Sequence, residues 1–245
     1  MDPLSKPSLA LAKKTLPQPL FEVLNYLADQ DLKDCVLAGG TALSGFYTGH
    51  RRSDDIDLFV KDNFSFKVAK LAILNLKKIQ VQFLKEVTSS YYYNANCSLK
   101  NHFFTIDIIL DENLFRVGEF FKIKNGFQVS SLRTLLSMKS AALVSRASEK
   151  DLSDVHKLFE IFKELSIAEF LKLGSAIDAG VNAESMLAAI GGAVLREDAC
   201  DFSLNSKTSK KIIFNEINEF QKIMIKSLQV YLQNAKAPAL GELLY

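Results

Sequence analysis

The sequence predicts an α+β fold, in which a small core built on a mixed sheet is followed by an all-helical C-terminal domain. Short apolar runs with strand-like alternation occur in the first half of the chain. From about Ser130 onwards the alternation stops, and apolar residues recur at helical spacing. We therefore expect an N-terminal tether at residues 1–16, the mixed core at 17–125 and the helical domain at 126–245.

Helices and strands are both expected in the core. Pro17 and Pro19 open the first helix, because proline is favoured in the first turn of a helix, and this helix ends near Asp29. Strands are then predicted at residues 35–38, 55–60, 80–87, 91–99 and 103–110, and helices at 41–48 and 64–78. The C-terminal domain is expected to contain helices at residues 131–146, 148–165, 167–173, 183–190 and 207–233, with Ser148 as an N-cap.

Composition and charge exclude several classes of protein. The 30 basic and 28 acidic residues nearly cancel, so the overall charge gives no case for nucleic-acid binding. The three cysteines are far apart and form no Cys-x-x-Cys pair, which argues against a disulfide framework and a zinc site. No apolar stretch is long enough to span a membrane, and no secretion signal is evident. We expect a cytoplasmic protein with no membrane attachment.

The residues with the clearest chemical meaning lie between the strands at 35–38 and 55–60. Gly39-Gly40-Thr41 ends the first strand and leaves room for a phosphate chain to approach backbone N–H groups. Asp55 and Asp57 alternate with apolar residues, so both carboxylates share one face of the second strand. Mg²⁺, or Mn²⁺ in its place, would relieve the repulsion between the two carboxylates and bind phosphate oxygens. Nucleotidyl transfer requires this combination of groups.

Simpler interpretations exist for the same residues. The spacing from Gly40 to Gly45 matches the start of a P-loop, but Phe46 and Tyr47 follow where a P-loop has Lys and Ser or Thr, so we reject that motif. The glycines alone would also suit a plain tight turn. Asp55 and Asp57 would, in the simplest alternative, be solvated turn residues.

The same stretch resembles a known family. Gly39-Gly40-Thr41-Ala42-Leu43, followed by Arg51, Ser53 and Asp55-Ile56-Asp57-Leu58, is similar to the AbiEii-type nucleotidyltransferases. These form a branch of the DNA polymerase β-like superfamily, and many are toxins of bacterial toxin–antitoxin or phage-defence pairs. The resemblance implies a nucleotidyltransferase core, with Asp55 and Asp57 as metal ligands and the glycine turn as part of the nucleotide site.

The resemblance also implies a third carboxylate on a neighbouring strand. Asp107 is the candidate, because it interrupts the apolar run at 104–109 and would be costly to bury without a metal or an arginine partner. In that role it would bind metal and accept the proton of the attacking hydroxyl. Asp111, at the strand end, is the competing candidate. Arg51 and Ser53 would contact phosphate, whereas a solvated loop with its arginines paired to Asp54 is the alternative.

Later motifs of the family resemble residues of the helical domain. A helix lysine, Lys139, is followed by Arg146 and by a Lys-Asp-x-x-Asp segment that contains Asp151 and Asp154. The resemblance implies that Lys139 neutralises triphosphate charge, and that an aspartate orients Lys139 or Arg146 or touches the nucleotide. Charge complementarity at a helix N-terminus is a sufficient alternative explanation for Asp151.

Taken with the resemblance, these residues predict a magnesium-dependent enzyme that transfers NMP from an NTP to a hydroxyl. The family further implies an RNA acceptor such as the 3′ end of tRNA, and a cognate antitoxin protein as partner. Two alternatives remain open. One is a non-catalytic nucleotide-binding or antitoxin-like partner, and the other is a phosphotransferase or a small-molecule nucleotidyltransferase.

Overall fold

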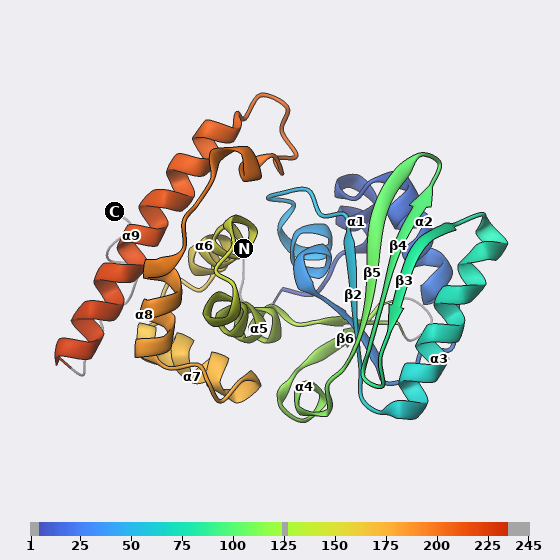
Figure 1. Cartoon of the computed structure of the whole chain (residues 1–245), viewed down its shortest axis with the longest axis horizontal. Coiled ribbons are helices and arrows are strands. Elements are labelled where there is room, and N and C mark those ends of the chain that lie inside the picture. Colours follow the sequence, from blue (N-terminus) through green and yellow to red (C-terminus); the bar gives the residue numbers. More distant parts are fainter. Residues whose placement is uncertain (1–4, 124–126, 235–245) are drawn as a thin grey trace. The chain divides into compact units, whose positions relative to one another are not determined.

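A computed structural model describes residues 5–123 and 127–234 of the chain (Figure 1). The described residues divide into two compact units, one within residues 6–131 and the other formed by Ser5 and residues 132–234. A mixed sheet lies in the first unit and helices make up the second, so the predicted α+β fold is confirmed. No helix in the described part of the chain is long and apolar enough to cross a membrane.

The sheet of the first unit has seven strands in the order β3-β4-β5-β2-β1-β7-β6. Their bounds are β1 Cys35–Ala38, β2 Asp55–Val60, β3 Gln82–Thr88, β4 Tyr92–Leu99, β5 His102–Leu110, β6 Phe120–Lys122 and β7 Gln128–Ser130. β2 runs parallel to β5, and β1 runs parallel to β7. The other neighbouring pairs are antiparallel. The predicted strands are therefore present, and the sheet gains β6 and β7 at one edge.

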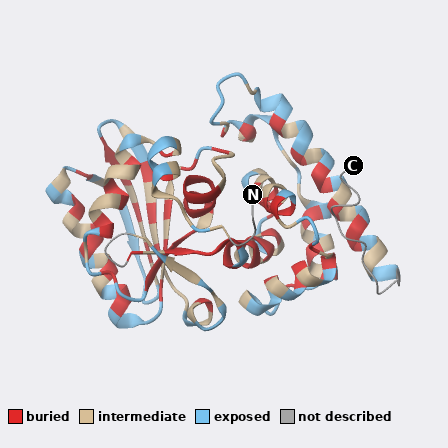
Figure 2. Ribbon diagram, turned by 180° about the vertical axis from the view of Figure 1, so that it is seen from behind, coloured by how far each residue is buried: buried red, intermediate tan, exposed pale blue. Residues whose placement is uncertain are grey.

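The sheet buries one face more deeply than the other, and the strands alternate accordingly (Figure 2). On β2 the buried residues are Ile56, Leu58 and Val60, and α3, Asn63–Leu74, packs on this side against β2 and β5. The alternate residues of β2, β4 and β5 are only half buried. Polar side chains can occupy that second face without the full cost of burial.

The first unit also contains helices α1 Leu9–Thr15, α2 Gln18–Ala28, η1 Thr41–Thr48, η2 Asn75–Ile79 and α4 Glu112–Val117. The helix predicted at 64–78 is divided into α3 and the 3₁₀ turn η2. Residues 9–15 fall in the segment expected to be a tether, but they form α1. Ser8 caps this helix by accepting a hydrogen bond from Leu11 N, and Thr15 Oγ1 donates to Gly45 O at 3.1 Å. The sequence carries Pro3 and Pro7 just before this segment, which favoured a tether, but the cap and this contact stabilise a helix.

The second unit is a set of packed helices. They are α5 Leu132–Ser145, α6 Glu149–Ile161, α7 Ile167–Ile177, α8 Ala183–Gly192, η3 Glu197–Cys200 and α9 Lys210–Asn234. Phe159 lies 5.1 Å from Phe170 and 6.0 Å from Phe220 between ring centroids, so aromatic side chains join α6, α7 and α9. Ser148 caps α6 as expected.

One detail of the chain order differs from the expectation, and two short strands were not predicted. β7 lies within the segment assigned to the helical domain, yet it pairs with β1 in the sheet. Three-residue strands such as β6 and β7 are too short to show alternation, so the sequence pattern did not reveal them.

Cys35, Cys97 and Cys200 are buried and none is in a disulfide, in agreement with the composition.

Candidate functional site

The glycine turn after β1 is shaped by Asp57. Gly39 has a φ of 65°, a left-handed conformation that favours glycine. A Cβ atom at this position would lie 1.8 Å from Asp57 Oδ2. The turn therefore needs glycine both for its backbone conformation and for the space that the Asp57 carboxylate occupies. This contact brings the glycine motif and the carboxylate motif together, although they are well separated in the sequence.

The turn leads directly into η1, which is a π-helix. Helices of this type are rare and often occur at functional sites. A Cβ atom on Gly40 would lie 2.2 Å from Arg51 Nη2, so the guanidinium of Arg51 packs against the second glycine. Arg51 is only 4% exposed, and its Nη1 donates to Arg52 O at 2.9 Å. A buried positive charge thus lies beside the turn.

Hydroxyl groups fasten the turn to the start of β2. Thr41 Oγ1 lies 3.0 Å from Ser53 Oγ and also donates to the carbonyl of Asp55. Ser53 is buried, as is Arg51. Arg52 is exposed and pairs with Asp54 at 3.4 Å, a contact that also belongs to the solvated-loop alternative, in which the arginines pair with Asp54. Contact of Arg51 and Ser53 with phosphate stays a prediction.

Three aspartates share the half-buried face of the sheet. Asp57 and Asp107 are direct partners in the parallel pairing of β2 with β5. Asp55 is the partner of Thr105 in the same pairing, and Thr105 Oγ1 donates to Asp55 Oδ1 at 2.7 Å. Partners in a ladder project to the same side, so all three carboxylates lie on one surface. We call this surface the carboxylate face, formed by Asp55, Asp57, Asn94, Thr105 and Asp107.

Asp107 has two hydrogen-bond donors that the sequence did not reveal. Tyr92 Oη donates to Asp107 Oδ1 at 2.7 Å, and Asn94 Nδ2 donates to the same oxygen at 2.8 Å. Burial raises the pKa of Tyr92 to about 12, helped by the hydrogen bond to Asp107 and by the charges of Asp107 and Asp57. The phenol is therefore protonated at neutral pH and acts as a donor.

The signal that could have identified these donors was the alternation of the strand at 91–99. It places Tyr92 and Asn94 on the same face, and Asn94 is the antiparallel partner of Asp107. The sequence does not reveal the register in which β4 pairs with β5, so the position of Asn94 opposite Asp107 could not be predicted. The competing acid, Asp111, instead caps α4 by accepting a hydrogen bond from Leu114 N at 2.9 Å.

The chemistry of the carboxylate face suits a hard divalent cation, because carboxylate oxygens are the preferred ligands of Mg²⁺. Thr105 donates to Asp55, and Tyr92 and Asn94 donate to Asp107, and hydrogen bonds of this kind commonly orient ligating carboxylates. Across residues 5–123 and 127–234, however, no three His, Cys, Asp or Glu side chains are grouped closely enough to hold a metal ion. The donor type fits a metal, and the metal site itself stays a prediction.

The second unit contains a separate group of charges, which we call the ion cluster: Lys139, Arg146, Asp151 and Asp154. Lys139 Nζ lies 2.9 Å from Asp151 Oδ1 and 2.7 Å from Asp154 Oδ2. Arg146 Nε and Nη2 both donate to Asp151, at 2.6 and 3.0 Å. Both aspartates are fully buried, and the Lys139 side chain is 8% exposed. Asp151 and Asp154 thus both orient Lys139.

The ion cluster keeps Asp151 ionised. Burial alone would raise the pKa of Asp151, but the charge of Lys139, the hydrogen bonds and charge of Arg146 and a hydrogen bond from Ser148 outweigh it. The net effect holds the pKa of Asp151 well below its usual range. Asp151 also lies in the first turn of α6, where negative charge is favourable. Both the orienting role and the helix-terminus explanation therefore apply to this residue.

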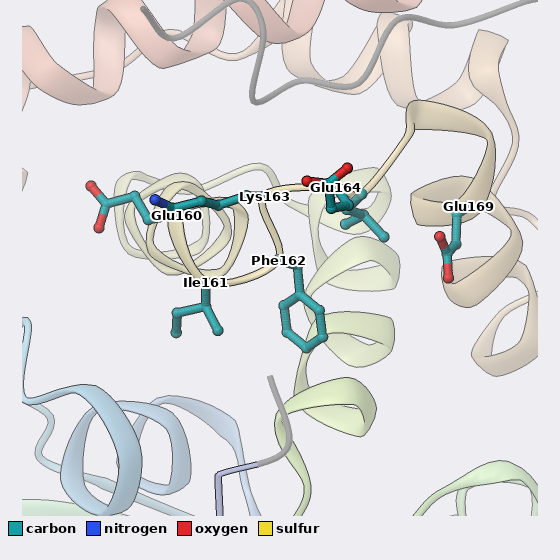
Figure 3. Close-up of a pocket in the computed structure, with 7 residues that line it drawn as sticks. Glu160, Ile161, Phe162, Lys163, Glu164 and Glu169 are labelled. Atoms are coloured by element: carbon teal, nitrogen blue, oxygen red, sulfur yellow. The ribbon is translucent and has the colours of Figure 1, made fainter. Parts of the chain in front are cut away.

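A hollow of about 450 Å³ opens at the end of α6 (Figure 3). Ile161, Phe162 and Leu165 supply its apolar surface, and Glu160, Lys163, Glu164 and Glu169 supply its charged groups. It contains none of the predicted site residues.

Comparison with known proteins decides the family. The model of the nucleotidyl transferase AbiEii toxin family, of type IV toxin–antitoxin systems, matches residues 23–231. This protein belongs to the AbiEii family. The match covers most of the chain, so the resemblance read from Gly39–Leu43 and Asp55–Leu58 is confirmed, and the protein is a nucleotidyltransferase. No curated protein sequence matches it.

The chain is also similar to solved structures. JHP933 from Helicobacter pylori has 20% sequence identity and a TM-score of 0.47, and the alignment covers 94% of this chain and 99% of that one. The nucleotidyltransferase toxin MenT4 from Mycobacterium tuberculosis H37Rv has 12% identity and a TM-score of 0.46, with 93% of this chain and 90% of that one aligned.

Proposed function

We propose that this AbiEii-family protein transfers a nucleoside monophosphate from an NTP to a hydroxyl of RNA, with the 3′ end of tRNA as the acceptor. We further propose that the transfer makes it a toxin, which a cognate antitoxin counteracts, and that it acts in the cytoplasm. Membership of the AbiEii family supports the toxin role. One observation carries the catalytic assignment: Asp57 contacts the Gly39 turn and is paired with Asp107 on the next strand.

In this proposal, the turn at Gly39–Thr41 receives the phosphates of the NTP. Backbone N–H groups where a helix begins are suited to phosphate oxygens. The turn lies at the start of η1 and is held to β2 by Thr41. The guanidinium of Arg51, packed against Gly40, adds positive charge there. Arg51 and Ser53 keep the loop in place and lie close to the expected phosphates.

Asp55, Asp57 and Asp107 are proposed to hold Mg²⁺, or Mn²⁺ in its place. The metal, when bound, would neutralise charge on the phosphates and activate the acceptor hydroxyl. The oxygen of this hydroxyl forms a bond to the α-phosphorus while the bond between the α-phosphorus and the bridging oxygen to the β-phosphate breaks. Pyrophosphate leaves, and Asp107 accepts the proton of the attacking hydroxyl.

Lys139 is proposed to balance triphosphate charge, with Arg146, Asp151 and Asp154 holding it in position. Support comes from the family resemblance and from the two ion pairs that orient its ammonium. This part of the proposal requires that Lys139→Arg, which keeps the charge, retains NTP affinity better than Lys139→Met. Equal NTP affinity of the two folded variants would show that the charge of Lys139 does not contribute to NTP binding.

The test is incubation of the protein with each α-labelled NTP, Mg²⁺ and total RNA. Asp57→Asn serves as the inactive variant, and Asp111→Asn as the matched control, because asparagine can still cap α4. We expect label on a discrete RNA band with the wild type and with Asp111→Asn, and none with Asp57→Asn. Label on protein or on a small molecule would support nucleotidyl transfer but exclude RNA as the acceptor. Absence of label with all four NTPs, with Mg²⁺ or Mn²⁺, would contradict the proposal.

The toxin role needs a separate experiment. Induced expression of the wild type should arrest bacterial growth, and Asp57→Asn, expressed to the same level, should not. Normal growth with an enzyme that is active in the labelling assay would exclude the toxin role and retain the transfer reaction.

A further inference from the structure

We propose that Tyr92 and Asn94 are positioning residues, which hold Asp107 by one oxygen and turn the other towards the reaction. The proposal rests on the proposed function of Asp107. Within the described part of the chain, Asp107 accepts both of its side-chain hydrogen bonds on Oδ1, from Tyr92 Oη at 2.7 Å and from Asn94 Nδ2 at 2.8 Å. Two donors at different positions on β4 fix both the location and the rotation of the carboxylate.

Strand geometry explains why these two residues can act together. Asn94 lies directly opposite Asp107 in the antiparallel pairing of β4 with β5, and Tyr92 lies opposite Ile109. The long side chain of Tyr92 reaches diagonally to the same carboxylate, a distance that aromatic residues span across strands. Both residues are half buried, so the hydrogen bonds are partly shielded from competing water.

The chemical type of the donors matters as much as their position. Tyr92 and Asn94 are neutral, so they orient Asp107 without cancelling its negative charge. A lysine or arginine in their place would form an ion pair and compete with a cation for the carboxylate. Hydrogen-bond partners of ligating carboxylates typically contribute 10- to 100-fold to metal affinity or activity. We expect Tyr92 and Asn94 to have effects of this size.

Tyr93, the residue after Tyr92, provides the control. Tyr93 points to the opposite face, is fully buried, and donates its hydroxyl to Glu86 Oε2 at 2.8 Å. Tyr93→Phe therefore removes an equivalent hydroxyl from the adjacent residue without touching Asp107. Tyr92→Phe removes the hydroxyl and keeps the aromatic ring, so it tests the hydrogen bond to Asp107 without removing the packing of the ring.

The experiment compares the wild type, Tyr92→Phe, Asn94→Leu and Tyr93→Phe in two assays. The first measures Mn²⁺ binding to the protein without NTP, by electron paramagnetic resonance. The second measures kcat and KM for NTP in the transfer reaction. Thermal unfolding without metal confirms that each variant is folded.

We expect Tyr92→Phe and Asn94→Leu each to weaken Mn²⁺ binding or lower kcat by about 10- to 100-fold, with KM for NTP nearly unchanged. Tyr93→Phe should behave as the wild type in both assays. If Tyr92→Phe and Asn94→Leu match Tyr93→Phe in Mn²⁺ affinity and kcat, the positioning role is overturned. If the wild type transfers no nucleotide, the proposed function fails, and Mn²⁺ binding alone then decides whether the two residues position Asp107.

Discussion

Asp107 on the carboxylate face and Asp151 in the ion cluster are the same residue type in opposite electrostatic settings. Asp107 is half buried and receives two neutral donors, Tyr92 and Asn94. Asp151 is fully buried and contacts two cations, Lys139 and Arg146. A carboxylate with neutral partners keeps its charge available for an incoming cation, whereas one paired with two cations has its charge already neutralised.

This difference in setting decides whether an aspartate contributes mainly to the stability of the fold or to catalysis. Buried ion pairs are costly to disrupt, because the removal of one partner leaves a charge without compensation in the interior. Half-buried carboxylates with neutral donors contribute little to folding and are suited to chemistry. We therefore predict that substitutions on the carboxylate face change activity with little effect on stability, whereas substitutions in the ion cluster lower stability in addition to any effect on NTP binding.

The largest effect is expected from Asp107→Asn. Loss of a general base typically lowers the rate by about 10²- to 10⁴-fold, and loss of a metal ligand would add to this. The asparagine carbonyl can still accept the hydrogen bonds of Tyr92 and Asn94, so the thermal unfolding midpoint should stay close to that of the wild type. Labelling kinetics and thermal unfolding of the same preparation check both parts. A variant that unfolds at much lower temperature would show that Asp107 is structural.

Lys139→Met should differ from Asp107→Asn by lowering stability, in addition to the weaker NTP binding proposed above. It removes the ammonium that contacts two fully buried carboxylates. Breaking a buried pair in this way typically costs about 3–5 kcal/mol of stability. Urea unfolding measures the loss, and Lys157→Met provides the control, because its ion pair with Glu160 is more exposed. Stability losses of equal size in the two variants would show that the buried ion pairs of Lys139 contribute no more to stability than an exposed pair.

Gly39→Ala is expected to affect both properties at once. The left-handed backbone costs a non-glycine residue about 1–2 kcal/mol, and the new Cβ would meet Asp57 Oδ2 and displace the carboxylate. Transfer activity should therefore fall together with stability. Gly192→Ala is the control, because a Cβ there would meet no atom within 4 Å. Full activity of Gly39→Ala would show that the contact with Asp57 is not required.

The smallest effect concerns pH. The folded protein holds the pKa of Asp151 below its unfolded value of about 3.9. The folded state therefore favours the ionised form of Asp151. The stability that the ionised Asp151 contributes to the folded protein is fully present above the unfolded pKa and is lost as the pH falls through the folded pKa. The stability difference between the wild type and Asp151→Asn should then shrink as pH is lowered below about 4. Urea midpoints at pH 7 and at lower pH check this, and a constant difference would contradict it.

Much of the fold could be predicted from the sequence, because long elements have clear periodicity. The alternation in β2, β4 and β5 and the helical spacing after Ser130 identify most of the secondary structure. The strands β6 and β7 are three residues long and carry no such signal. Helix α1 was obscured by the prolines around it, although Ser8 is a favourable cap.

The candidate site likewise contains residues that the sequence reveals and residues that only the folded sheet reveals. The motifs of Gly39–Thr41 and Asp55–Asp57 are local, so the sequence alone revealed them. The donors Tyr92, Asn94 and Thr105 depend on the register between β4, β5 and β2, which arises only when the sheet forms. The residues that orient a carboxylate are therefore harder to predict than the carboxylate itself.

The position of the transferred label tests most directly whether the carboxylate face carries out nucleotidyl transfer. Wild type and Asp57→Asn would be incubated with RNA, Mg²⁺ and each NTP labelled at either the α- or the γ-phosphate. We expect α-label to join the acceptor with an equal amount of pyrophosphate released, γ-label never to do so, and Asp57→Asn to transfer neither. Transfer of γ-label would identify a phosphotransferase, and transfer of α-label by Asp57→Asn would show that the carboxylate face does not carry the reaction.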